Sequence, residues 1–478
     1  VPLYSATHAF GLMSSLQPES LSGSRIYTGG FKSSHGNFTS GVVDATFKSG
    51  PVESAGASVT FSPYIDGIYI ETPGRLALRI GARYSPVYEL GGYVIDNFKD
   101  RLEILSDLEE DFGVRGRMYD VNAQAIFQAS ERIRIKAVGF AARDFLDVAE
   151  ERFRVHTGWQ TWMGKAGLEM DLGDSSRLDL TLYASHSESE EGQESYDDKG
   201  KVYSSVSLDN TLLDVTARAA LTHTFAKRFD FNGGVELRHM LSGTSLSAFT
   251  DIDTYLGPKV DLSVGLRPTL YTSKAVTRAN LDAHVLADVN LSDRVGLEFT
   301  FDRMNQYFHV LEGLPTGWSL DLSVPIESAY PEETSNQLYA GVFTRFRTRE
   351  LSYPGTMDIN FNVGAYFKDM SNMVGYVSSV NLLRNKTNNW QTDTDCGAGR
   401  SFGLETSLLL NSEKMSANLS YTLSHTDRQF PMINGGMRFP FKFDRPHILN
   451  VQLDMTTVDR QSRGGGCHVR HHAIGDLA

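Results

Sequence analysis

Apolar and polar side chains alternate along most of the sequence, from about residue 55 onward. In residues 280–291, the odd positions from Leu281 to Leu291 are all apolar, whereas the even positions are mostly polar. Successive side chains of a β-strand point to opposite faces, so this segment is predicted to be a strand with one apolar and one polar face. The same alternation recurs in residues 177–185, 214–222, 358–368 and 415–424.

The connections between these segments are alternately short and long. The short ones are residues 173–176, 226–227, 291–293 and 411–414. The long, polar ones are residues 87–115, 186–209, 308–333, 371–399 and 426–445. Short turns on one rim and long loops on the other are typical of an outer-membrane β-barrel, and roughly ten residues suit a tilted strand that crosses a membrane. About seventeen candidate strands can be counted, too many for one ordinary soluble sandwich.

The composition and the absence of a repeat argue against several other classes of protein. The sequence contains no run of 18 apolar residues, which excludes a transmembrane helix but not a barrel, whose two faces cancel in the average hydropathy. A soluble propeller or β-helix would show a fixed repeat period, and none is present. The net charge of −13 argues against a nucleic-acid partner. Two cysteines give no disulfide framework.

Residues 1–53 differ from the rest, because they are Gly-rich and irregular in period. We expect them to form a small unit before a barrel that spans residues 54–459. Residues 460–478 show no strand alternation and no terminal aromatic strand, so we expect an irregular tail from a truncated or frame-shifted end. The chain opens on Val1 without the charged and apolar regions of a signal peptide, so we expect the true N-terminus to lie upstream.

Short motifs occur in a characteristic order. Residues 4–11 (YSATHAFG) and 17–21 (QPESL) are followed by 25–31 (RIYTGGF), Gly36 and 40–44 (SGVVD). This order resembles the end of the plug domain of TonB-dependent outer-membrane receptors. Later motifs resemble the barrel of a branch of this family that often carries a carboxypeptidase-like domain before the plug. These motifs are 303–309 (RMNQYFH), 314–316 (LPT), 324–325 (VP), 331–332 (PE), 366–370 (YFKDM) and 443–450 (FDRPHILN).

The resemblance covers nearly all of residues 1–458 and implies an all-β fold, a transmembrane antiparallel barrel preceded by the end of a plug. The family closes its barrel at about twenty-two strands. With about seventeen present, we expect the last few strands to be missing, and the energy-coupling box and most of the plug to precede Val1. An open barrel has unpaired edges that hydrocarbon does not tolerate, so this fragment alone is not expected to insert stably.

The resemblance also implies active uptake across the outer membrane of a Gram-negative bacterium. The ligand would be a siderophore, metal chelate, vitamin, peptide or glycan, because a fold does not specify function. A siderophore or other metal chelate is the default, since such ligands are frequent in the family. The implied partners are TonB and its inner-membrane proton-motive complex, outer-membrane lipid and lipopolysaccharide, and a surface lipoprotein. Two alternatives stay open: a passive porin-like channel, which needs no plug, and a surface adhesin or receptor.

Two groups of residues are candidates for this function. Aromatic side chains and a histidine would contact the ligand, although aromatics at a barrel rim are more often girdle residues at the membrane interface. These are Tyr307, Phe308, His309, Trp318 and Trp390. The resemblance implies that Gly29, Gly30, Gly36 and Asp44 belong to the plug that gates the barrel. Glycines permit tight turns inside a crowded lumen, but each is equally compatible with an ordinary turn.

An acidic run would attract cations, although a solvated hydrophilic loop is the commoner explanation of such runs. It consists of Glu188, Glu190, Glu191, Glu194, Asp197 and Asp198. Residues 399–403 (GRSFG) match the G-x-S-x-G motif, which requires a strand-to-helix turn, whereas a strand is predicted to follow here. Cys467, His468, His471 and His472 have ligand-like spacing but lie in the suspect tail. We therefore predict no catalytic residue, no metal site and no cofactor.

Overall fold

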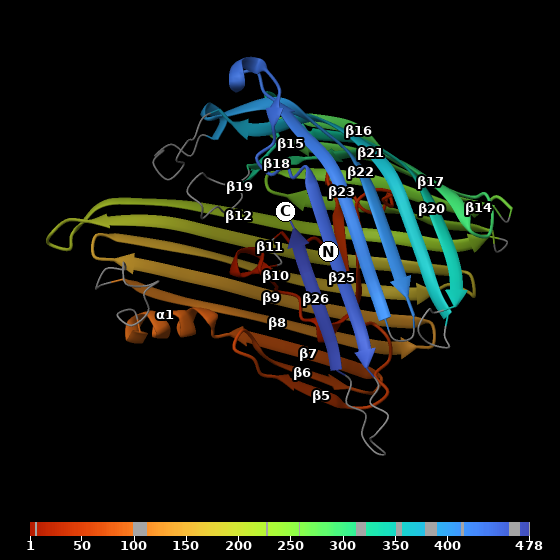
Figure 1. Cartoon of the computed structure of the whole chain (residues 1–478), viewed down its shortest axis with the longest axis horizontal. Helices are drawn as coiled ribbons and strands as arrows, with labels where there is room; N and C mark the ends of the chain where they lie inside the picture. Colours follow the sequence, from red (N-terminus) through yellow and green to blue (C-terminus); the bar gives the residue numbers. More distant parts are fainter. Residues whose placement is uncertain are drawn as a thin grey trace.

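Most of the chain forms one large antiparallel sheet that is rolled into a barrel (Figure 1). The computed structural model describes residues 1–4, 7–98, 112–225, 228–257, 259–311, 322–349, 356–377, 390–412, 415–457 and 469–477. The strands of the sheet follow one another in chain order, with two exceptions. β17 (Val295–Gln306) pairs directly with β20 (Glu333–Arg349). β23 (Met415–Gln429) pairs with both β24 (Phe439–Pro440) and β25 (His447–Thr457).

The longest barrel strands have 21 to 24 residues, and the register of the hairpin formed by residues 176–225 is continuous over most of its length. Their bounds are β5 Gly56–Thr60, β6 Asp66–Thr72, β7 Leu76–Ser85, β8 Gly113–Ser130, β9 Ile133–Glu150, β10 Phe153–Asp171, β11 Ser176–Tyr196, β12 Val202–Phe225, β13 Phe229–Met240, β14 Gly243–Tyr255, β15 Val260–Ser273, β16 Thr277–Asn290, β17 Val295–Gln306, β20 Glu333–Arg349, β21 Thr356–Tyr376, β22 Thr394–Asn411, β23 Met415–Gln429, β24 Phe439–Pro440, β25 His447–Thr457 and β26 Val469–Leu477.

The barrel is apolar outside and polar inside, which is the reverse of a soluble protein. On β16, Leu281 is 47% exposed on the outer face, whereas its neighbour Asp282 is only 3% exposed and faces the lumen. Large apolar side chains are exposed on nearly every barrel strand, and many of the most deeply buried residues carry polar or charged groups. This distribution fits a barrel whose outer surface lies against lipid. None of the described helices is long and apolar enough to cross a membrane.

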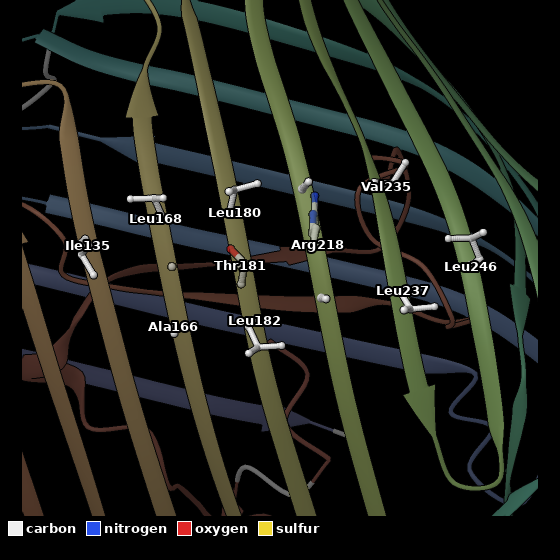
Figure 2. A pocket seen from close by; sticks show the side chains of 13 residues that line it. Ile135, Ala166, Leu168, Leu180, Thr181, Leu182, Arg218, Val235, Leu237 and Leu246 are labelled. Atoms are coloured by element: carbon white, nitrogen blue, oxygen red, sulfur yellow. The ribbon is translucent and has the colours of Figure 1, made fainter.

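A shallow groove of about 630 Å³ follows the outer face of β9 to β14 (Figure 2). Its floor consists of small residues, Ala166, Gly167, Ala217 and Ala219, and larger aliphatic side chains border it. Figure 2 shows Leu168, Leu180 and Leu182 among these border residues, on adjacent strands. The groove lies on the apolar outer face, where lipid chains would fill it.

The first 50 residues, which we call the inner segment, do not join the barrel sheet. They form two small sheets, β1 (Thr7–His8) with β2 (Met13–Ser14) and β3 (Leu21–Tyr27) with β4 (Val42–Phe47). Two short 3-10 helices accompany them, η1 (Ala9–Gly11) and η2 (Pro18–Ser20). Side chains on the inner face of the barrel contact these elements, so the inner segment occupies the lumen.

The longer connections carry their own structure. The first contains helix α1 (Val87–Phe98), which packs against β8 (Figure 1). Another contains the hairpin β18 (Phe308–Leu311) and β19 (Leu322–Pro325). Two further 3-10 turns are η6 (Trp390–Thr392) and η7 (Asn434–Gly436). These connections lie on the rim opposite the short turns, as the alternation of lengths predicted.

Three expectations need correction. Residues 186–209 are not a long loop, because β11 and β12 stay paired up to Tyr196 and Val202. Residues 460–478 are not irregular throughout, because Val469–Leu477 forms β26 on the edge of β25. The sheet accordingly has twenty strands within the described residues, more than the expected seventeen. Backbone hydrogen bonds alone can extend a strand, so neither segment needed an apolar face to join the sheet.

Candidate functional site

A buried histidine joins the inner segment to the wall formed by β8 and β9. The two ring nitrogens of His8 face two carboxylates: Nδ1 faces Asp144, and Nε2 lies 3.1 Å from Asp120. Asp144 also accepts the backbone N–H of Ala9 at 2.8 Å, and Arg83 approaches Asp120 at 2.9 Å. Burial by itself lowers the pKa of His8, but the two carboxylates outweigh this effect and raise it to about 9. His8 therefore carries a positive charge at neutral pH and forms an ionic latch between the inner segment and the wall.

A second contact lies on the opposite wall, where Asp302 of β17 faces the Gly29–Gly30 turn. The carboxylate of Asp302 accepts the backbone N–H of Gly30 at 2.8 Å and that of Phe31 at 3.2 Å, and it pairs with His284 at 2.9 Å. Gly30 has φ +65°, a conformation that glycine adopts without strain. Asp302 therefore binds the backbone of the inner segment, and the glycine permits the turn that presents the two N–H groups.

Arginines and carboxylates form a third contact around β12 to β15. Arg267 pairs with Glu236 at 2.7 Å and donates to the carbonyl of Ser33 at 3.3 Å. The N–H of Ser33 donates in turn to Asp251 at 2.7 Å. The side chain of Arg267 lies directly against Gly36, where a Cβ would overlap its guanidinium. Gly36 is thus required by this close approach.

A methyl group at this position should loosen the third contact. In Gly36→Ala, Arg267 must shift away from Glu236 and Ser33, and overpacking of this kind costs about 1–3 kcal/mol. We expect a lower midpoint temperature for loss of the folded form, measured by the heat-dependent mobility of the barrel in gel electrophoresis. Gly23→Ala is the matched control, because a Cβ at Gly23 would meet no atom within 4 Å. Equal midpoints for the two variants would contradict this assignment.

The remaining gate candidate, Asp44, lies in β4 opposite Arg25 of β3. The three glycines therefore meet the barrel wall directly, whereas Asp44 lies within the small sheet of the inner segment. The structure places these residues without testing a gating role, which stays a prediction.

The aromatic candidates for ligand contact are buried. The ring of Tyr307 stacks on Tyr271 with centroids 5.0 Å apart, and its backbone N–H donates to Asn37 of the inner segment at 2.7 Å. Phe308 packs edge-on against Tyr4 of the inner segment. His309 is 1% exposed, and its Nε2 lies 3.3 Å from the carbonyl of Tyr330. These side chains face inward, so they are not girdle residues at the membrane interface.

Trp390 lies beside this group, because its ring packs on Tyr330 at 4.7 Å. Trp318 lies outside the described residues. Four of the five candidates are thus placed around β18 and β19, at the long-loop end of the lumen. Their role as ligand contacts stays a prediction.

The acidic run lies on the hairpin of β11 and β12 rather than in a loop. Glu188 accepts the amide of Gln160, and Asp198 pairs with Arg152 at 2.7 Å. Asp197 accepts two backbone N–H groups in the turn. Glu191 differs from the others, because it is 2% exposed and its Oε2 atom has no hydrogen-bond partner in the described part of the structure.

No family model and no curated protein sequence matches the chain. Solved outer-membrane proteins match its fold at low identity. The copper transporter OprC has a TM-score of 0.62 at 11% identity over 93% of this chain and 72% of its own. The hemophore receptor HasR of Serratia marcescens has 0.61 at 14%, over 99% and 82%. The FrpB iron transporter of Neisseria meningitidis has 0.58 at 11%, over 96% and 79%. The chain has the fold of the TonB-dependent outer-membrane transporters.

The all-β barrel predicted from the sequence is confirmed. The solved proteins that match its fold are transporters and receptors. The G-x-S-x-G match lies inside β22, where Ser401 shares a hydrogen bond with Thr426 at 2.9 Å. The Thr426 hydroxyl cannot act as a general base for Ser401. The described residues 394–411 form a continuous strand, without the strand-to-helix turn that the motif requires. Within the described residues, no cluster of three or more metal-ligating side chains occurs. Cys467 and His468 lie outside the described residues, and the side chains of His471 and His472 are not described.

Sequence reasoning missed the residues that hold the inner segment. His8, Asp120, Asp144 and Asp302 come from four separate segments, and no short motif unites them. One feature of the sequence could have indicated the three aspartates: each is a carboxylate on the polar face of a strand with regular alternation. In a TonB-dependent transporter fold, that face lines a lumen in which a charged group needs a partner.

Proposed function

We propose that this chain is part of a TonB-dependent transporter for active uptake of a scarce nutrient across the outer membrane of a Gram-negative bacterium. The observation that supports this proposal most directly is the inner segment, which lies within an apolar-outside barrel and is bound at three places on its wall. A barrel of this width would otherwise enclose an aqueous hole. The inner segment is the end of the plug, and the ionic contacts hold it closed.

The inner segment discriminates between the alternatives. A passive porin conducts through an open lumen, whereas here the aromatic group around β18 and β19 packs onto the inner segment. A surface adhesin needs the loops but has no use for a plug held by reversible polar contacts. We therefore favour transport, with the buried aromatic group becoming accessible to ligand as the loops rearrange.

The proposed partners follow from the same function. TonB and its inner-membrane proton-motive complex would move the plug from the periplasmic side, and lipid with lipopolysaccharide would cover the apolar outer face. A surface lipoprotein is a further proposed partner at the loops. The ligand is proposed to be a siderophore or other metal chelate. The names of solved proteins with this fold support that choice, because they include a copper transporter, an iron transporter and a ferripyoverdine receptor.

Uptake by cells tests this proposal. Cells that express the complete gene should accumulate radiolabelled ferric or cupric chelates, and the accumulation should stop on collapse of the proton-motive force or deletion of TonB. Uptake that persists in both cases would support the porin. Binding of a chelate without any uptake would support the surface receptor.

A further inference from the structure

A cavity of about 310 Å³ separates the inner segment from the wall made by β17, β20, β21 and β22. On the inner-segment side it is bordered by Thr28, Gly29 and Gly41. On the wall side it is lined by Glu298, Thr300, Gln337, Tyr339, Tyr366, Lys368 and Glu405. We call this space the wall cavity; its volume lies at the lower end of the range for small-molecule sites.

The register of the four strands explains how the wall cavity is built. Glu298, Gly341, Gly364 and Glu405 form one row of directly paired residues across the sheet. The hydroxyl of Tyr339 lies over the two glycines, closer than 3.0 Å to the place where a Cβ of either would stand. The glycines thus let the tyrosine lie flat on the wall. A side chain at either position would push the ring into the space that is now open.

Glu298 and Glu405 stand at the two ends of this row and line the cavity from its two outer strands. Three strand spacings separate them, roughly 14 Å between backbones, so Glu298 and Glu405 do not form a close pair. Lys368 lies on β21 four positions beyond Gly364 and lines the same cavity. The wall cavity therefore contains two carboxylates and one ammonium, a net charge of −1.

The charged groups of the wall cavity differ from those elsewhere in the lumen. Among the described residues, Glu298, Lys368 and Glu405 form no hydrogen bond or ion pair, whereas Asp144, Asp302 and similar wall carboxylates bind the inner segment. The inner segment presents mainly backbone here, and a Cβ on Gly29 would come within 3.0 Å of the Gln337 amide. Because a charge in a lumen needs water or a partner, these groups are available to a solute.

We propose that the wall cavity binds the cationic group of a small solute, an ammonium or guanidinium, between plug and wall. Glu298 and Glu405 supply the attracting charge, and the rings of Tyr339 and Tyr366 supply aromatic faces suited to a cation. This inference rests on the proposed transport function and adds the charge class of the solute. In this proposal, Glu298 and Glu405 cause the wall cavity to prefer a cation over an anion.

The test measures charge preference with small thiol reagents. In a background where Cys396 and Cys467 are replaced by serine, Thr300→Cys places a reporter thiol in the cavity wall. Thr161→Cys is the matched control, because Thr161 is also a buried, inward-facing threonine but lies on β10. Cationic methanethiosulfonate ethylammonium and anionic methanethiosulfonate ethylsulfonate are applied to outer-membrane vesicles. The ratio of the two rates is compared between the reporters.

We expect the cationic reagent to be favoured at Thr300→Cys by about tenfold over the ratio at Thr161→Cys, since nearby unpaired charges act through a low local dielectric. Glu298→Gln with Glu405→Gln should abolish this excess, and Lys368→Gln should increase it. Equal ratios at the two reporters, an excess unaffected by the glutamine substitutions, or a Thr300→Cys thiol that neither reagent reaches in folded protein would each overturn the inference.

The rates measured in vesicles test the cation site independently of transport. Charge preference at the reporter needs neither TonB nor a proton-motive force. A charge-independent cavity in a protein that accumulates chelates would overturn the inference alone. A cation-preferring cavity in a protein without energised uptake would overturn the transport proposal and leave a cation site in a plugged barrel.

Discussion

Removal of residues 1–50 is expected to turn the barrel into an open aqueous pore. The inner segment lies in a lumen lined by polar side chains, and a barrel of this width encloses a water-filled channel when nothing occupies it. In planar bilayers, the complete barrel with this deletion should give discrete conductance steps about tenfold or more above the same barrel without the deletion. Cells that express it should also become sensitive to antibiotics too large for ordinary porins.

The control for this deletion is a variant that keeps the inner segment but carries Gly23→Ala, where a Cβ would meet no neighbour. It should conduct no more than the intact chain. Heat-dependent gel mobility shows whether the deletion barrel is folded. A folded deletion protein that conducts no better than the intact chain would refute the assignment of these residues as the plug.

Asp144→Ala should release the β1 end of the inner segment. This carboxylate faces the ring of His8 and accepts the N–H of Ala9 at 2.8 Å, and all three groups are buried. Loss of one partner from a buried charged pair costs about 3–5 kcal/mol. We expect faster hydrogen exchange of the amides of residues 7–14, by roughly two orders of magnitude or more, with exchange in the barrel strands unchanged.

The matched control is Asp147→Ala on the same strand. Asp147 is buried like Asp144, but among the described residues it pairs with the half-exposed Arg154 and not with the inner segment. Exchange in residues 7–14 should therefore stay slow in the control. If both variants exchange alike, His8 and Asp144 are not the latch.

The same latch should weaken at high pH. The pKa of His8 is raised from about 6.5 to about 9, so its protonated form is favoured in the folded protein. The resulting stabilisation, on the order of 3 kcal/mol, is fully present below pH 6.5 and is lost as the pH rises through 9. Exchange of residues 7–14, corrected for the intrinsic effect of pH, should accelerate across this window. The acceleration should be absent in His8→Gln.

Much of the fold could be predicted from the sequence, because apolar and polar residues alternate along a barrel strand that has one face on lipid and one on the lumen. The pattern in 280–291 predicted β16 and its outward Leu281 correctly. The pattern failed where a strand is polar on both faces, as in β11 near its end at Tyr196. It also failed in β26, which is held in the sheet by backbone pairing to β25. In those places the strand depends on a neighbour's backbone, and that neighbour is not visible in the local sequence.

The candidate site could be predicted only in part. Gly29, Gly30 and Gly36 were singled out through the resemblance to a plug, and the structure places side chains of the barrel wall directly against each of them. His8 and its carboxylates were missed because the latch depends on which barrel strand faces which part of the inner segment. Burial of Phe308 and His309 was also missed, since both lie in residues 308–333, which were expected to be a long polar loop.

The hairpin of β11 and β12 reaches well beyond the lipid. With 21 residues in β11, the strand is about 70 Å long, and even at a tilt of roughly 45° it rises about 50 Å, against a hydrocarbon layer of about 30 Å. Its outer end bears Glu188, Glu190 and Glu194. A large particle that approaches the cell, such as an antibody or a bacteriophage, would therefore meet these acidic side chains well outside the lipid.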